Sequence, residues 1–118
     1  MGLLDGKIAI ITGAARGQGE ATARLFHAEG ASLMLTDVSP AGEALAKGLG
    51  GDAIFQRLDV AAPADWHALA DLAKRSFGKV DVLVNNAGVT GNEAADTIKP
   101  AEMQRYLDIH VFGPLFGI

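Results

Sequence analysis

The sequence predicts a doubly wound α/β fold, in which helices cover both faces of a parallel sheet. Two observations favour this class. Short runs rich in apolar and β-branched residues alternate with longer segments of helical period, and a glycine-rich turn directly follows the first run. Parallel strands must be joined by crossovers, and the segments of helical period supply them.

The first two strands are expected at residues 7–12 and 32–37, where apolar residues predominate. Residues 19–30 lie between them and have helical period. The residues that share one face of this helix are Ala21, Leu25 and Ala28. A shorter helix is expected at residues 40–50, because proline favours the start of a helix and glycine its end.

The third and fourth strands are expected at residues 53–60 and 80–88, and the fourth runs into a turn. Residues 63–78 form a helix between them. Its apolar positions at helical spacing are Trp66, Leu69, Leu72 or Ala73, and Phe77. Pro100 opens a last helical segment that continues to Ile118. We expect Met34, Trp66, Phe77 and Met103 to pack in the core or between helices.

The last strand and the last helix leave apolar residues without cover. The fourth strand is rich in Val and Leu, as in a strand buried on both faces, and the final helix stops at the apolar "LFGI". Such a strand at a sheet edge would promote aggregation. We therefore expect a sheet truncated after four strands, with residues 1–118 forming the front half of a longer single domain.

The composition narrows the choice of partners. The 118 residues carry a formal net charge of −4 and contain no cysteine, and no cluster of like charges occurs. Nucleic acid and anionic membranes are therefore not expected as partners, and no metal site is expected. No signal peptide or membrane-spanning run is present in the sequence, so we expect a cytoplasmic protein.

Glycines cluster in "ITGAARGQGEA", between the first strand and the first helix. Such a turn is tight, and the N–H groups at the start of the helix can bind a pyrophosphate. We expect Gly13 to allow the turn, Gly17 the close approach of a cofactor, and Gly19 the close packing of helix on strand. At this point the alternative remains that the segment is only a glycine-rich turn and binds no ligand. An ATP-binding P-loop is excluded, because Glu20 follows Gly19 where lysine is required.

Asp37 ends the second strand, 18 residues after Gly19. At this position a carboxylate can accept hydrogen bonds from the two hydroxyls of an adenosine ribose. The same charge repels a 2′-phosphate, so NAD is favoured over NADP as the cofactor. Arg16 is evidence in the other direction, because a basic residue in this loop could pair with a 2′-phosphate.

Three motifs in order, "TGAARGQG", "LDV" and "NNAG", resemble the short-chain dehydrogenase/reductase family over the whole chain. The resemblance implies a Rossmann-type sheet with four cofactor contacts. These are Gly13, Arg16, Gly17, Gln18 and Gly19 at the pyrophosphate, Asp37 and Val38 at the adenosine ribose, Asp59 and Val60 at the adenine, and Asn86, Ala87 and Gly88 at the nicotinamide ribose. A capping role before the next helix stays open for Asp59.

The resemblance also implies hydride transfer between nicotinamide and an alcohol or carbonyl carbon. The family uses a Ser, a Tyr followed four residues later by a Lys, and an Asn after N-N-A-G. Only the Asn has a corresponding position here, and it is His110, which either replaces the Asn or only fills space. Tyr106 does not match, because His110 and not a lysine follows it. We therefore expect no catalytic residue in these 118 residues and no activity of the chain alone.

Two functions remain open. In the first, the chain is the NAD-binding part of an oxidoreductase that acts on a small alcohol or ketone and forms a homo-oligomer through the helix that begins at Pro100. In the second, it is a non-catalytic module that binds a nucleotide or a partner, with residues 112–118 covered by another polypeptide.

Overall fold

The computed structural model describes residues 2–90 and 96–118. Four strands form one parallel sheet in the order β3-β2-β1-β4. The strands are β1 (Ile8–Ile11), β2 (Ser32–Asp37), β3 (Ala53–Arg57) and β4 (Val82–Val84). The helices that connect them are α1 (Gly17–Ala28), α2 (Ala41–Leu49) and α3 (Pro63–Phe77). The expected doubly wound parallel fold is confirmed.

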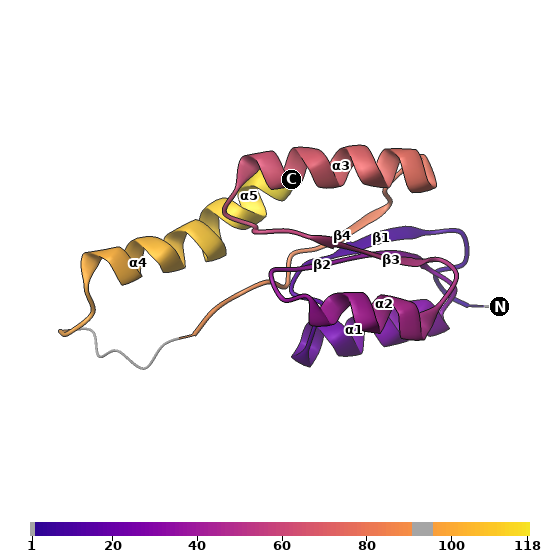
Figure 1. The fold of residues 1–118 in the computed structure, drawn as a ribbon, viewed down its shortest axis with the longest axis horizontal. Helices are drawn as coiled ribbons and strands as arrows, with labels where there is room; N and C mark the ends of the chain where they lie inside the picture. The colour runs from indigo at the N-terminus through magenta and orange to yellow at the C-terminus, as the bar shows by residue number, and fades with distance from the viewer. Residues whose placement is uncertain (1, 91–95) are drawn as a thin grey trace.

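Helices cover both faces of the sheet, with α1 and α2 on one side and α3 on the other (Figure 1). Successive residues of a strand point to opposite faces, so β1 and β2 supply both cores. Ile11 and Leu35 belong to the core on the side of α1 and α2. Ile10 and Met34 belong to the core on the side of α3, together with Trp66.

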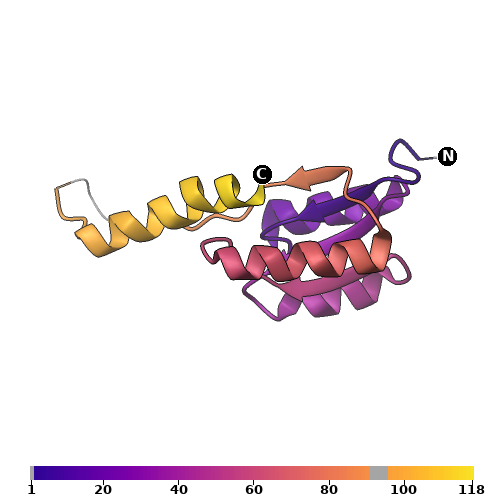
Figure 2. The ribbon, with the colours of Figure 1, turned by 90° about the horizontal axis from the view of Figure 1, so that it is seen from above.

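The rest of the described chain is a helical segment, residues 100–118, that we call the C-terminal rod. It consists of α4 (Pro100–Leu107), a π-helical turn η1 (Asp108–Phe112) and α5 (Gly113–Gly117). The rod extends away from the sheet, and only its α5 end lies beside α3 (Figures 1 and 2). This projection gives the molecule its elongated shape of 52 × 25 × 24 Å.

Two strand ends differ from the sequence-based expectation. The third strand stops at Arg57 rather than at residue 60, because residues 58–60 turn toward α3 and bind its first turn. The fourth strand is limited to Val82–Val84, because the chain after Val84 turns back onto β1 through bonds to Thr12. This strand lies at the edge of the sheet, as expected for a sheet truncated after four strands, and it is half-buried.

The expected packing face of α1 is wrong. Ala21, Leu25 and Ala28 are exposed, and Leu25 retains 60% of its accessible surface. The buried positions are Gly19 and Ala23, which have the same helical spacing but smaller side chains. Met103 is also exposed, at 46%, whereas Met34, Trp66 and Phe77 contribute to the core on the side of α3 as expected.

Candidate functional site

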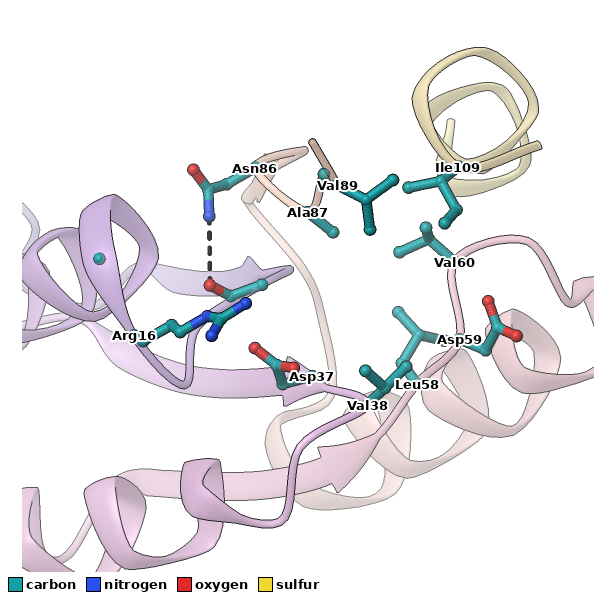
Figure 3. A pocket seen from close by; sticks show the side chains of 13 residues that line it. Arg16, Asp37, Val38, Leu58, Asp59, Val60, Asn86, Ala87, Val89 and Ile109 are labelled. Carbon is teal, nitrogen blue, oxygen red and sulfur yellow. Dashed lines mark hydrogen bonds between the residues drawn. The ribbon is translucent and has the colours of Figure 1, made fainter. Parts of the chain in front are cut away.

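A cavity of about 260 Å³ lies where β1, β2 and β3 end and the chain enters the following turns (Figure 3). Ten of the twelve candidate binding residues line it: Gly13, Arg16, Gly17, Asp37, Val38, Asp59, Val60, Asn86, Ala87 and Gly88. The two that do not are Gln18, which is exposed on α1, and Gly19, which is buried. The fold thus brings three distant sequence motifs together at one edge of the sheet.

The glycine turn has backbone conformations that require glycine. Gly13 has a φ of 64° and Gly17 a φ of 61°, values that other residues rarely adopt. A Cβ on Gly13 would also lie 2.8 Å from the Cα of Ala87. A Cβ on Gly17 would meet no protein atom within 4 Å, so the space above this residue is open. The turn therefore leaves room for a ligand at the start of α1.

Gly19 brings α1 close to the end of β1. A Cβ at this position would collide with the carbonyl oxygen of Gly13 and with the side chain of Asn86. The N-terminal end of α1, with its unpaired N–H groups and its positive dipole, is therefore held at the cavity. Arg16 is exposed at the same end of the helix and adds a positive charge to the cavity wall.

Thr12 joins the glycine turn to the segment that follows β4. Its side chain is 1% exposed, and its hydroxyl oxygen accepts the N–H groups of Asn86 at 3.0 Å and Ala87 at 2.9 Å. The same hydroxyl donates to the carbonyl of Val84 at 3.3 Å. The buried threonine therefore fixes two of the cavity's walls against each other.

Asn86 is bound to the glycine turn through its side chain. Its Nδ2 donates to the carbonyl oxygen of Thr12 at 3.1 Å and to that of Gly13 at 3.2 Å. Figure 3 marks the second of these bonds with a dashed line. The sequence motif predicted a contact with a ribose, whereas the structure uses the amide N–H₂ group to hold the turn. Asn86 still lines the cavity.

Asp37 stands at the end of β2 with its carboxylate oriented by two backbone groups. Oδ2 accepts the N–H of Ala15 at 3.0 Å, and Oδ1 accepts the N–H of Ser39 at 2.9 Å. These bonds fix the side-chain torsions before any ligand is present. Each carboxylate oxygen keeps a second lone pair that can accept a further hydrogen bond.

Asp59 and Val60 form the wall of the cavity opposite the glycine turn. The Oδ1 of Asp59 accepts the N–H of Ala61 at 2.9 Å and forms a short turn before α3, whereas the N-cap of that helix is Ala62 and has no side-chain cap bond. Its Oδ2 and the N–H of Val60 make no hydrogen bond within the described residues. One acceptor and one donor are therefore available on neighbouring residues.

His110 lies on the π-helical turn η1 and reaches back to the segment after β4. Its Nε2 is 3.1 Å from the N of Val89 and 2.9 Å from the O of the same residue. A neutral ring accepts from the first or donates to the second, depending on which nitrogen carries the proton. His110 thus attaches the C-terminal rod to the end of the cavity.

Three cavity residues were not among the candidates: Leu58, Val89 and Ile109. Leu58 and Val89 are sequence neighbours of candidate residues, and Ile109 is adjacent to His110. They are apolar, and an apolar wall residue carries no chemical signal in the sequence. A hint was available for Leu58 only, since it belongs to the "LDV" motif.

Within residues 2–90 and 96–118, no group of three or more His, Asp or Glu side chains has the arrangement of a metal site. In the same part of the chain, no helix combines the length and the apolar character that crossing a membrane requires.

The sequence was compared with protein families and curated proteins. The family model described as short chain dehydrogenase matches residues 7–118. A protein of Mycobacterium bovis named 3-alpha-(or 20-beta)-hydroxysteroid dehydrogenase is 40% identical over 118 residues, which are 99% of this chain and 45% of that protein. The sex determination protein tasselseed-2 of Zea mays is 44% identical over 122 residues, 98% of this chain and 36% of its own length. The chain thus spans less than half the length of these relatives.

Solved structures of the same family have the same fold as this chain. A 3-ketoacyl-(acyl-carrier-protein) reductase from Brucella melitensis, complexed with NADH, has a TM-score of 0.94 and 36% sequence identity. The match covers 97% of this chain and 48% of that protein. A short chain dehydrogenase/reductase from Burkholderia phymatum, in complex with NAD, has a TM-score of 0.93 and 36% identity, with 99% and 43% covered.

Proposed function

Because the chain belongs to the short-chain dehydrogenase family, we propose that it is the cofactor-binding part of an oxidoreductase and that it binds NAD in the cavity at the end of the sheet. The observation that carries this proposal is the placement of Asp37 and the glycine turn on one cavity. The carboxylate and the positive end of α1 lie at different parts of its wall, as the ribose and the pyrophosphate of a dinucleotide require.

The glycine turn fits a pyrophosphate. Gly13 and Gly17 have left-handed conformations, and the space above Gly17 is open. Backbone N–H groups at the start of α1 would bind the phosphate oxygens, and Arg16 would add a positive charge. Gln18 would contribute through its backbone N–H, so the identity of its side chain matters little. Gly19 would act indirectly, by bringing the helix close enough.

Asp37 favours NAD over NADP. Ala15 and Ser39 already hold its carboxylate in one orientation, so binding two ribose hydroxyls costs little further ordering. A 2′-phosphate at the same place would be repelled by the negative charge. Two of the solved structures that resemble this chain are complexes with NADH and with NAD. Val38, 57% exposed beside Asp37, would cover the adenosine.

The wall formed by Asp59 and Val60 fits an adenine ring. The free Oδ2 of Asp59 would accept the exocyclic amino group, and the free N–H of Val60 would donate to the neighbouring ring nitrogen. Asn86, Ala87 and Gly88 would form the wall at the nicotinamide end. Bound there, the nicotinamide supplies hydride exchange with an alcohol or carbonyl carbon, and the residues of this chain hold and orient the dinucleotide.

A titration tests the proposal. NAD and NADP are titrated separately into the purified chain and the heat of binding is recorded, and NAD should bind more tightly. Asp37→Ala should weaken NAD binding by about 1–3 kcal/mol, because charge-assisted hydrogen bonds are lost. Asp71→Ala removes the same charge from the exposed side of α3 and should leave binding unchanged. Tighter binding of NADP by the unmutated chain would contradict the proposed role of Asp37.

We further propose that the complete protein reduces or oxidises a small alcohol or ketone, and that this chain alone does not. Tyr106 is followed by His110 and by no lysine, so the sequence offers no Tyr-Lys pair for proton transfer. The 118-residue chain should therefore produce no NADH from NAD and an alcohol, measured by absorbance. Measurable turnover would contradict this assignment.

The exposed side chains of the C-terminal rod favour a second role for this chain, the binding of a protein partner. The large apolar side chains of the rod are exposed along its length, and they are Met103, Leu107, Val111, Phe112, Leu115, Phe116 and Ile118. A cluster of exposed apolar side chains on one short segment is typical of a protein contact. We propose a homo-oligomer formed through this surface. Replacing Leu107 and Val111 together by serine should lower the mass in solution, measured by light scattering.

A further inference from the structure

The loop that carries Asp59 and Val60 is held by two consecutive residues of α3. Asp65 Oδ2 accepts the N–H of Asp59 at 2.9 Å, and the indole Nε1 of Trp66 donates to the carbonyl of Val60 at 2.9 Å. Neither side chain lines the cavity. Both therefore act on the loop from behind, on the side of α3.

The two bonds lie on either side of a single peptide group. The N–H of Asp59 precedes the Asp59–Val60 peptide and the carbonyl of Val60 follows it, so the two bonds anchor the backbone on both sides of that peptide. The indole bond is protected from water, because Trp66 is 8% and Val60 is 7% exposed. The Asp65 carboxylate forms an ion pair with Arg57, whose Nη1 lies 3.6 Å from Asp65 Oδ2.

We propose that Asp65 and Trp66 are positioning residues for adenine recognition. They fix the peptide between Asp59 and Val60. This peptide carries the N–H of Val60, and the side chain next to it carries the Oδ2 of Asp59. With the peptide fixed, the acceptor and the donor stand together at the cavity wall and match the amino group and the ring nitrogen of adenine. This inference rests on the proposed function, because it assumes that the cavity binds an adenine dinucleotide.

The test compares NAD with nicotinamide hypoxanthine dinucleotide. In hypoxanthine a carbonyl oxygen replaces the amino group and the adjacent ring nitrogen carries a proton, so both hydrogen bonds are mismatched. The unmutated chain should bind NAD about tenfold more tightly than the analogue, because two polar groups are left unpaired with the analogue. Calorimetry measures both affinities, and their ratio reports recognition of the base rather than stability of the fold.

Asp65→Ala should reduce this preference to less than about threefold, since the N–H of Asp59 loses its acceptor. Asp65→Asn keeps an acceptor oxygen and should retain the preference. Trp66→Phe keeps the ring in the core, removes the N–H donor and should reduce the preference as Asp65→Ala does. Asp71→Ala, which removes the same charge from the exposed side of α3, is the matched control and should behave as the unmutated chain.

The outcomes separate the two proposals. If the unmutated chain binds neither dinucleotide, the proposed function fails and the positioning role fails with it. If NAD binds and its preference survives both Asp65→Ala and Trp66→Phe, only the positioning role is overturned. If Asp65→Asn loses the preference as Asp65→Ala does, the ion pair with Arg57 and not the hydrogen bond is responsible, which also overturns the role proposed for the Asp59 contact.

Discussion

The sheet body (residues 2–90) and the C-terminal rod (residues 100–118) differ in how far their apolar side chains are buried. In the body, β1 and β2 are covered on both faces, and Ile11, Leu33 and Leu35 have no exposed surface. In the rod, α4 has no buried residue, and Leu115 and Ile118 are 60% and 95% exposed. The body thus buries the apolar residues of its two central strands, whereas most large apolar residues of the rod stay exposed.

This difference separates two tasks within one chain. Hydrophobic burial is the main favourable contribution to folding, so the stability of the monomer must come from the body. The exposed residues of the rod contribute little to that stability, and they are suited to contact another surface. The candidate cavity belongs mainly to the body, and the rod reaches it through Ile109 and through the bond of His110 to Val89.

The largest contrast should come from the same substitution made in both regions. Leu33→Ala removes a fully buried side chain from the middle of β2 and should lower the free energy of unfolding by about 2–5 kcal/mol. Leu115→Ala in the rod should change it by less than about 0.5 kcal/mol, because the side chain is already 60% exposed. Urea denaturation of both variants measures the two values. Equal losses would show that the rod is part of the cooperative core.

The next effect concerns the bond network that connects the walls of the cavity. Thr12→Val preserves the shape of the side chain but leaves the N–H of Ala87 without its acceptor. It also removes one of the two acceptors of the Asn86 N–H, which keeps the carbonyl of Val84 at 3.0 Å. We expect a loss of about 1–3 kcal/mol in the free energy of unfolding, because these groups are part-buried. Thr22→Val, on the exposed side of α1, is the matched control and should cost much less. A similar cost for both would argue against a special role of Thr12.

Much of the body could be predicted from the sequence, because chemistry and period agree there. Gly13, Gly17 and Asp37 carry specific chemical requirements, and the structure places them on one cavity. The error at α1 has a physical reason. Leu25 and Ala23 both belong to sets with helical spacing, and the sequence favours the larger residue, whereas the side of α1 that packs on the core carries Gly19 and Ala23.

The parts that could not be predicted depend on tertiary contacts. Asn86 is identical in type to a ligand-binding asparagine, yet its amide group is used within the protein by the carbonyls of Thr12 and Gly13. The early end of β3 follows from bonds that Asp65 and Trp66 make to the loop after it, and such contacts leave no local pattern. The apolar wall residue Ile109 is placed at the cavity by the π-helical turn, which the sequence does not signal.

A smaller effect is expected where the rod meets the body. His110→Ala removes the only side-chain bond between η1 and Val89 in the described part of the chain, and the N–H of Val89 should exchange with solvent about tenfold faster. His110→Asn should preserve or improve protection, since an amide can accept from the N–H and donate to the carbonyl at the same time. Amide exchange by NMR measures both. His67→Ala, an exposed histidine of α3, is the control, and slow exchange of Val89 in His110→Ala would refute the attachment.

The smallest effect concerns pH, and it arises in the body alone. Asp81 Oδ2 accepts the N–H of Ile8 at 2.9 Å and lies 3.0 Å from the Nζ of Lys79. The hydrogen bond from Ile8, and then Lys79, lower the pKa of Asp81 below its ordinary value of 3.8. Folding therefore favours the charged form, so this contribution to stability is complete above the ordinary pKa and is lost as the pH falls through the lower folded value.

The unmutated chain and Asp81→Asn should consequently differ most in their urea midpoints near neutral pH, and the difference should shrink once the pH falls below 3.8. The effect is small because the carboxylate is close to solvent. Glu102→Gln, which removes an acid that pairs with Arg105 in the rod, should leave the midpoint nearly unchanged at either pH, because α4 has no buried residue. A pH-independent difference for Asp81→Asn would contradict the prediction, because it would mean that the charge of Asp81 contributes nothing to stability. The hydrogen bond from Ile8 would then connect the start of β4 to β1 without a contribution from the charge of Asp81. The difference in stability between body and rod would in that case come from apolar packing and not from electrostatics.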